Sequence, residues 1–190
     1  MILAGFRRRS QDRIVATLYG AVVAQARLPA FYADFGVPDT VEGRFDMLVL
    51  HLVLLLRRLG QESELRRDLG QDLFDAFCRD LDANLREMGV GDLAVPKRMQ
   101  RFAEAFYGRQ AAYLEALSAA EPRAIENALA RNIFAGDASG NAVALADYVA
   151  AAVRGLDAQA DDALNRSALE FPAPKAAPSE VPRENVNARP

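Results

Sequence analysis

Apolar side chains recur at steps of one, three and four over residues 73–88, which predicts an amphipathic α-helix. Charged side chains occupy its other faces, and Asp75 and Asp82 each precede an arginine by four residues. Such pairs stabilise an exposed helix too weakly to account for the pattern by themselves. We therefore predict a helix with one packed and one charged side. Its apolar stripe consists of Leu73, Phe74, Phe77, Leu81, Leu85 and Met88.

A second helix is predicted directly after the first. Gly89 follows the last periodic residue, where glycine commonly ends a helix in the left-handed conformation. After the linker GVGDL, Pro96 occupies a position suited to the first turn of a helix that continues to Leu117. A short linker between two helices predicts an antiparallel pair.

The start of this second helix breaks a local rule. Lys97, Arg98 and Arg101 place positive charge where the helix dipole favours negative charge. Exceptions of this kind occur at functional sites, so the turn is a candidate binding surface. The alternative is that these are solvated charges, partly neutralised by Asp92 and Glu87 across the turn.

Further helices are predicted over residues 12–27, 122–134 and 142–154, and a weaker one over 157–169. Asn141 is the predicted N-cap of the helix over 142–154. Residues 44–59 are the most apolar stretch. Their apolar run, 47–56, is shorter than the roughly 20 residues that cross a bilayer, and it is hydrophobic on every side. We predict that it forms the central, buried helix. Residues 61–70 are predicted to be a loop or a short helix.

These elements predict an all-α fold, a single helical domain of about seven helices without strands or repeats. The predicted organisation is a flexible basic N-terminus at residues 1–11, the helical domain at 12–170, and a disordered tail at 171–190. The tail contains five prolines and few apolar residues.

Composition narrows the function classes. With 51% hydrophobic and 26% charged residues and a net charge of -3, the chain is typical of globular proteins, and DNA is not an expected partner. The N-terminus lacks the pattern of a secretory signal. The single cysteine, Cys78, is predicted to be a small half-buried residue in a reducing compartment. The single histidine, His51, is predicted to be a hydrogen-bonded core residue rather than a metal ligand.

No catalytic motif was found: a phosphate-binding glycine loop, an HExxH pair, a GxSxG elbow and a CxxC pair are all missing from the sequence. Asp75, Asp82 and Glu87 are an alternative Mg²⁺ or acid–base site, but a solvated helix face is favoured because no second acidic motif faces them. We therefore predict a non-enzymatic protein with no catalytic, cofactor-binding or metal-binding residues. One histidine and one cysteine also argue against tight haem ligation by this chain alone.

Several longer phrases resemble the ubiquinol-cytochrome c chaperone family, known in mitochondria for a cytochrome b assembly factor. They are GVPDT, GRFDM, LREMGVGD, VPKRM and YGR, and the resemblance extends from about Tyr19 to Leu117. It implies a bacterial-type assembly chaperone for the cytochrome bc1 complex that binds newly made cytochrome b or bc1 subunits. The ribosome, a small partner protein and the inner-membrane surface are further partners that it suggests. The implied location is cytoplasmic, with peripheral contact to the inner membrane as an option.

On this interpretation the client or partner surface lies around the predicted turn. A second patch, or alternatively an ion pair that fixes the central helix, is expected at the start of that helix. The competing hypothesis is a ribosome- or RNA-binding module that uses residues 7–9 and 97–101. The candidate binding residues are Asp82, Arg86, Glu87, Asp92, Lys97, Arg98, Tyr107 and Arg109 at the turn, with Arg44 and Asp46 as the second patch.

Overall fold

The computed structural model describes residues 2–60, 64–121, 123–136, 140–160 and 169–175. Within these residues the chain forms six helices of ten residues or more and one short helix, α2, and no strand, as predicted. The elements are α1 (Ile2–Ala26), α2 (Pro29–Ala33), α3 (Val41–Gly60), α4 (Glu64–Glu87), α5 (Val95–Ser118), α6 (Ala124–Ile133) and α7 (Gly140–Ala158).

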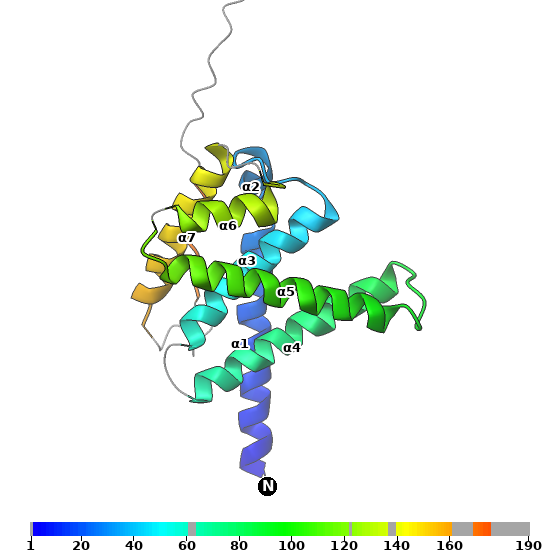
Figure 1. Ribbon diagram of the computed structural model, residues 1–190. Helices are drawn as coiled ribbons and strands as arrows, with labels where there is room; N and C mark the ends of the chain where they lie inside the picture. Colours follow the sequence, from blue (N-terminus) through cyan, green and yellow to red (C-terminus); the bar gives the residue numbers. More distant parts are fainter. Residues whose placement is uncertain (1, 61–63, 122, 137–139, 161–168, 176–190) are drawn as a thin grey trace, which may run out of the picture.

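Helix α3 is the centre of the domain, which confirms the prediction for the most apolar stretch (Figure 1). It packs against α1, α4, α5, α6 and α7. From Val49 to Leu55 every residue of α3 is buried, whichever side of the helix it occupies. A helix that is apolar all round is stable only when other helices cover all its faces, and this requirement organises the fold.

Helices α4 and α5 form the predicted antiparallel pair, and the end that joins them projects from the body of the domain (Figure 1). Gly89 has φ +77°, the left-handed conformation predicted from its position. Its N–H donates to the carbonyl of Arg86, and the N–H of Val90 donates to the carbonyl of Leu85. These two bonds end α4 in a Schellman motif, so the direction of the chain at the turn is fixed.

Several predicted boundaries were wrong. Helix α1 begins at Ile2, so residues 2–11, predicted to be a flexible terminus, continue the helix without a break at residue 12. Helix α4 begins at Glu64, so most of the stretch predicted to be a loop or short helix belongs to it. Residues 61–63 and Pro122 lie outside the described residues. Asn141 lies within the first turn of α7 rather than ahead of it.

The C-terminal end of the fold also differs from the prediction. Helix α7 continues to Ala158, beyond the predicted end at residue 154. Residues 169–175 are described, and the first of them lie against the core: Leu169 is buried and Phe171 packs on the core cluster. The predicted helix over 157–169 and the predicted tail otherwise fall on residues 161–168 and 176–190, which lie outside the described part.

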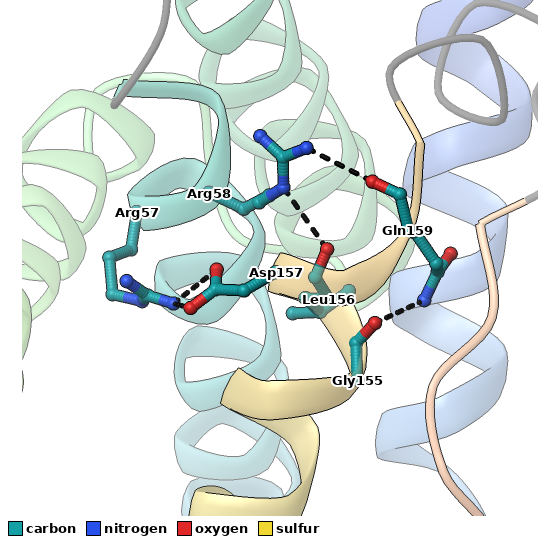
Figure 2. A network of polar contacts seen from close by, with 6 residues as sticks. All are labelled: Arg57, Arg58, Gly155, Leu156, Asp157 and Gln159. Carbon is teal, nitrogen blue, oxygen red and sulfur yellow. Dashed lines mark hydrogen bonds and ion pairs between the residues drawn. The ribbon is translucent and has the colours of Figure 1, made fainter.

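Two consecutive arginines of α3 hold the end of α7 (Figure 2). Nη2 of Arg57 contacts both carboxylate oxygens of Asp157, at 2.6 and 2.5 Å. Arg58, which is buried, donates from Nε to the carbonyl of Leu156 at 3.0 Å and from Nη2 to that of Gln159 at 3.1 Å. A guanidinium placed there satisfies carbonyls that a helix end leaves unpaired and complements the negative end of the helix dipole.

Candidate functional site

The turn between α4 and α5 carries a small network of charges, here called the corner. Nε of Arg86 lies 2.6 Å from Asp82 Oδ2, one turn earlier on α4, and its Nη1 lies 2.6 Å from Asp92 Oδ1 in the linker. The two carboxylates hold the pKa of Arg86 above its ordinary value, chiefly through the hydrogen bond to Asp82. One guanidinium thus ties the linker to the end of α4, and three predicted residues meet here.

The basic residues at the start of α5 remain open to solvent. Lys97 and Arg98 are exposed, and neither has an ion pair within the described ranges. Asp92, which was considered as their neutralising partner, is instead bonded to Arg86, and Glu87 is exposed and forms no ion pair with either of them among the described residues. Lys97 and Arg98 are thus open to solvent, as the solvated-charge alternative holds, although neither forms a direct ion pair with Asp92 or Glu87 within the described residues. The start of α5 thus carries exposed positive charge beside the exposed acidic groups Glu87 and Asp92.

Arg44 and Asp46 do not form a joint patch. Nε of Arg44 binds Asp39 Oδ1 at 2.7 Å in the loop before α3, and both groups are largely exposed. Asp46 is buried and faces α5, where its Oδ1 lies 2.7 Å from Nη2 of Arg109. The predicted pairing of Arg44 with Asp46 was therefore wrong. Asp46 does join α3 to the hairpin, but through Arg109 of α5.

Tyr107 and Arg109 lie two positions apart but have different surroundings. Tyr107 is 55% exposed, and its ring lies 5.6 Å from that of Phe74. Arg109 turns inward, and its guanidinium lies 5.7 Å from the centre of the Phe45 ring. Tyr107 remains available to a partner, whereas Arg109 belongs to the interior contact between α3 and α5.

Burial changes the titration of the Asp46 site. Burial raises the pKa of Asp46 to about 6, and the nearby charge of Arg109 opposes that rise. Tyr113, which is fully buried beside this pair, has its pKa raised by burial and by the negative charge of Asp46. The pair therefore behaves as an interior ion pair that links two helices, rather than as a surface for binding.

His51 is a core histidine, as predicted. Its Nδ1 faces the carbonyl of Met47 at 2.8 Å, so this nitrogen carries the proton, and its Nε2 accepts from the hydroxyl of Tyr148 at 2.8 Å. Burial lowers the pKa of His51 to about 4, which keeps the ring neutral. The Tyr148 hydroxyl accepts from Gln25 Nε2, which also donates to the carbonyl of Pro172. This chain of bonds, the His51 network, joins α3, α7, α1 and the C-terminal segment.

Cys78 is half-buried and packs on the core, as predicted. Burial raises the pKa of its thiol, which keeps the sulfur protonated and unreactive. No group of three or more His, Cys, Asp or Glu side chains within the described residues is arranged to hold a metal ion.

Sequence reasoning missed an apolar groove between α1, α3, α4 and α5, with a volume of about 240 Å³. Met88 at the end of α4 and Val41 at the start of α3 lie at its rim, and they are 62% and 69% exposed. The apolar stripe of α4 was recognised, but Met88 was assigned to the core. Only the tertiary arrangement leaves that last stripe position without a covering helix.

One stretch, Ser10–Ala33, has the length and mean hydropathy, 1.4, of a membrane-crossing helix. It lies near the N-terminus and comprises most of α1 together with α2. In the fold, α1 packs against α3 and α4. Length and composition alone are weak evidence for a span, because the core helix of a globular protein satisfies the same criteria.

Comparisons with known proteins agree with this architecture. The sequence model of the family described as "Ubiquinol-cytochrome C chaperone" matches residues 33–171. The match continues through α6 and α7, well beyond Leu117, where the resemblance seen in the sequence ended. No curated protein matches the chain.

A solved structure, described as the crystal structure of the Cbp3 homolog from Brucella abortus, has a similar fold. It is 40% identical, the alignment covers 91% of this chain and 97% of that one, and the TM-score is 0.80. The overall helical fold is thus shared with that solved structure. The chain belongs to the ubiquinol-cytochrome c chaperone family.

Proposed function

We propose that this protein binds newly made cytochrome b during assembly of the cytochrome bc1 complex and catalyses no reaction. Membership of the chaperone family supports a role in assembly of that complex. Cytochrome b is proposed as the client because the sequence resembles a family known for a cytochrome b assembly factor.

The observation that carries the proposal is the form of the corner. The Schellman motif fixes the direction of the chain at the turn, and Arg86 links the linker to the end of α4. Lys97 and Arg98 lie beside it on α5, exposed and unpaired within the described part of the chain. An array of exposed charges favours a complementary partner through electrostatic steering and orientation.

The test is complementation of a strain that lacks the gene. A variant with Lys97→Glu and Arg98→Glu is expected to restore little cytochrome b or assembled bc1 complex, while other membrane proteins remain near normal. The matched control reverses Arg131 and Arg154, exposed arginines on α6 and α7. Circular dichroism must show that both proteins are folded. Full restoration of cytochrome b by the corner variant would contradict the proposal.

The same variants separate protein binding from the ribosome or RNA alternative. A nucleic-acid contact made by several cations weakens steeply as salt increases. Sedimentation with ribosomes at increasing salt, compared between the native protein and the corner variant, measures that contact. A steep loss for the native protein, together with unchanged cytochrome b binding by the variant, would favour the ribosome alternative.

A cytoplasmic location with peripheral contact at the inner membrane is part of the same proposal, because the client is synthesised into that membrane. Cell fractionation tests it. We expect the protein in the soluble fraction, with a membrane-bound share that increases when cytochrome b is being made and is released by salt or alkali. A share that resists alkali would contradict peripheral contact.

A further inference from the structure

The apolar groove is lined by residues from the end of α1, the start of α3 and the end of α4, and by one ring from α5. Its apolar residues come from four helices that are distant in the sequence, so the groove exists only in the folded domain. Those apolar residues are Val23, Ala26, Val41, Phe45, Leu48, Leu81, Leu85, Met88 and Phe102.

Two large hydrophobic side chains at the groove are exposed to solvent. Val41 and Met88, two of the large hydrophobic residues that the fold leaves exposed, stand at the same opening. Scattered exposed hydrophobic residues need no explanation, but two that border one apolar hollow indicate a binding surface. Met88 adds a flexible, polarisable side chain, which suits surfaces that adapt to different partners.

The size of the groove indicates what fits in it. At about 240 Å³ it is smaller than the roughly 300 Å³ at which pockets for drug-sized ligands begin. Such a space suits a few anchoring side chains of a longer ligand. An amphipathic helix supplies anchors of that kind at positions i, i+3 or i+4, and i+7, laid into a groove between helices.

One polar residue of the groove, Arg27, favours an acidic residue of a partner beside it. Arg27, at the end of α1, and Arg44, on α3, both line it, and both also line a shallow depression beside Tyr32. Arg27 is exposed and has no ion pair within the part of the chain that is described. Arg44 is paired with Asp39, and Asp80, which accepts a hydrogen bond from Tyr19 at 2.8 Å, keeps its negative charge. Arg27 is therefore the lining cation beside which an acidic residue of a partner fits.

We propose that this groove binds an amphipathic helix of the client protein, with its apolar side chains against Met88 and Val41 and an acidic residue beside Arg27. The inference rests on the proposed function, since it names the part of the client that the chaperone holds. It adds a site that the candidate residues at the corner do not include. The corner then orients the client, and the groove covers apolar surface that the unassembled client exposes.

Site-specific cross-linking tests the location. The full-length protein is made with a photoreactive phenylalanine analogue in place of Met88, or in place of Val143 on α7 as a control, since Val143 is 36% exposed and outside the groove. Cytochrome b is then synthesised in a cell-free system with membranes. We expect light-dependent cross-links to cytochrome b from position 88 and none from position 143.

Binding measurements test the chemistry. The probes are fluorescent helical peptides with leucines on one face and glutamates at one end, and the same peptides with lysines instead. Met88→Glu should weaken binding of the acidic peptide by about tenfold, because a charge enters an apolar contact. Met88→Leu and Val143→Glu should leave it within about twofold. Arg27→Glu should weaken binding of the acidic peptide and strengthen binding of the lysine peptide.

The outcomes distinguish the groove from the proposed function. If cytochrome b copurifies with the protein but does not cross-link from position 88, the groove proposal is overturned and the proposed function stands. If cytochrome b neither copurifies nor cross-links, both are overturned. Cross-links from position 88 to a second copy of this chain, to its own C-terminal residues or to lipid, without cross-links to cytochrome b, would also overturn the assignment to a client helix.

Discussion

The corner and the His51 network are both polar, but they differ in burial and in how fully their groups are bonded. In the corner, Arg86 is half-exposed and its acidic partners face water. In the network, His51 is completely buried, and both ring nitrogens have partners at 2.8 Å. Exposed ion pairs contribute little to stability, whereas loss of one member of a buried network leaves others unsatisfied. Changes in the network should therefore affect folding, and changes in the corner should affect binding.

The largest expected effect comes from His51→Ala. It removes a ring packed against Phe31 and Phe171 and leaves the Tyr148 hydroxyl without its acceptor. The free energy of unfolding should fall by about 3 to 4 kcal/mol, from the cavity and the lost hydrogen bonds together. Urea denaturation followed by circular dichroism measures it. A loss below about 1 kcal/mol would show that the network is not a main determinant of the fold.

The second prediction concerns pH. The pKa of His51 is about 4 in the folded protein and near 6.5 as its reference value, so the unfolded chain binds the proton more readily. Stability should be complete above pH 6.5 and fall by up to about 3 kcal/mol as the pH decreases to 4. Denaturation across this range measures the slope.

A second group acts in the opposite direction and must be controlled. The pKa of Asp46 is about 6 in the folded protein, above its ordinary value of 3.8. As the pH falls, the folded state therefore binds this proton before the unfolded chain does, and the contribution of Asp46 to stability rises between pH 6 and 3.8. An Asp46→Asn background removes this contribution. In that background the loss towards pH 4 should be steeper, and a flat profile there would contradict the assignment to His51.

The third prediction concerns the ion pair between Arg109 and Asp46, whose expected effect on stability is intermediate. Arg109→Ala leaves the buried Asp46 carboxylate without its charge partner, which should lower the free energy of unfolding by about 2 kcal/mol. Arg109→Ala combined with Asp46→Asn should cost less than the sum of the single changes. Additive losses in this double-mutant cycle would mean that the two groups do not interact.

The smallest predicted effect is at the corner itself. Gly89→Ala places a side chain at φ +77°, where open space surrounds the position and only the backbone conformation is unfavourable. The expected cost is about 1 kcal/mol, measured by thermal or urea denaturation. Gly91→Ala in the same linker is the matched control, since its φ is not in the left-handed region. Equal losses for the two variants would contradict the role of Gly89.

Local patterns predicted the helices well because their causes are local. The all-round apolar character of residues 47–56 required burial, the stripe ending at Met88 required a packed face, and Gly89 required a turn. The environments of His51 and Cys78 were also correct, since a lone histidine within an apolar run has few other options. Boundaries were poorer where no residue ends the helix, as at residues 2–11.

Pairings between distant residues were beyond local reasoning. Arg44 stands two positions from Asp46, yet it binds Asp39, while Asp46 reaches Arg109 across the interface with α5. Charge and spacing do not determine which of several arginines a carboxylate meets, because the packing of helices decides it. The groove was missed for the same reason: four helices supply its lining, and the apolar residues that each contributes look like ordinary core positions.

The bond from Gln25 to the carbonyl of Pro172 spans 147 positions in the chain. During translation, α1 emerges early, but the half-buried amide of Gln25 finds that carbonyl only after almost the whole domain has left the ribosome. Closure of the domain is therefore a late event in synthesis, and a stop codon ahead of residue 169 would leave the rings of His51 and Tyr148 open to water.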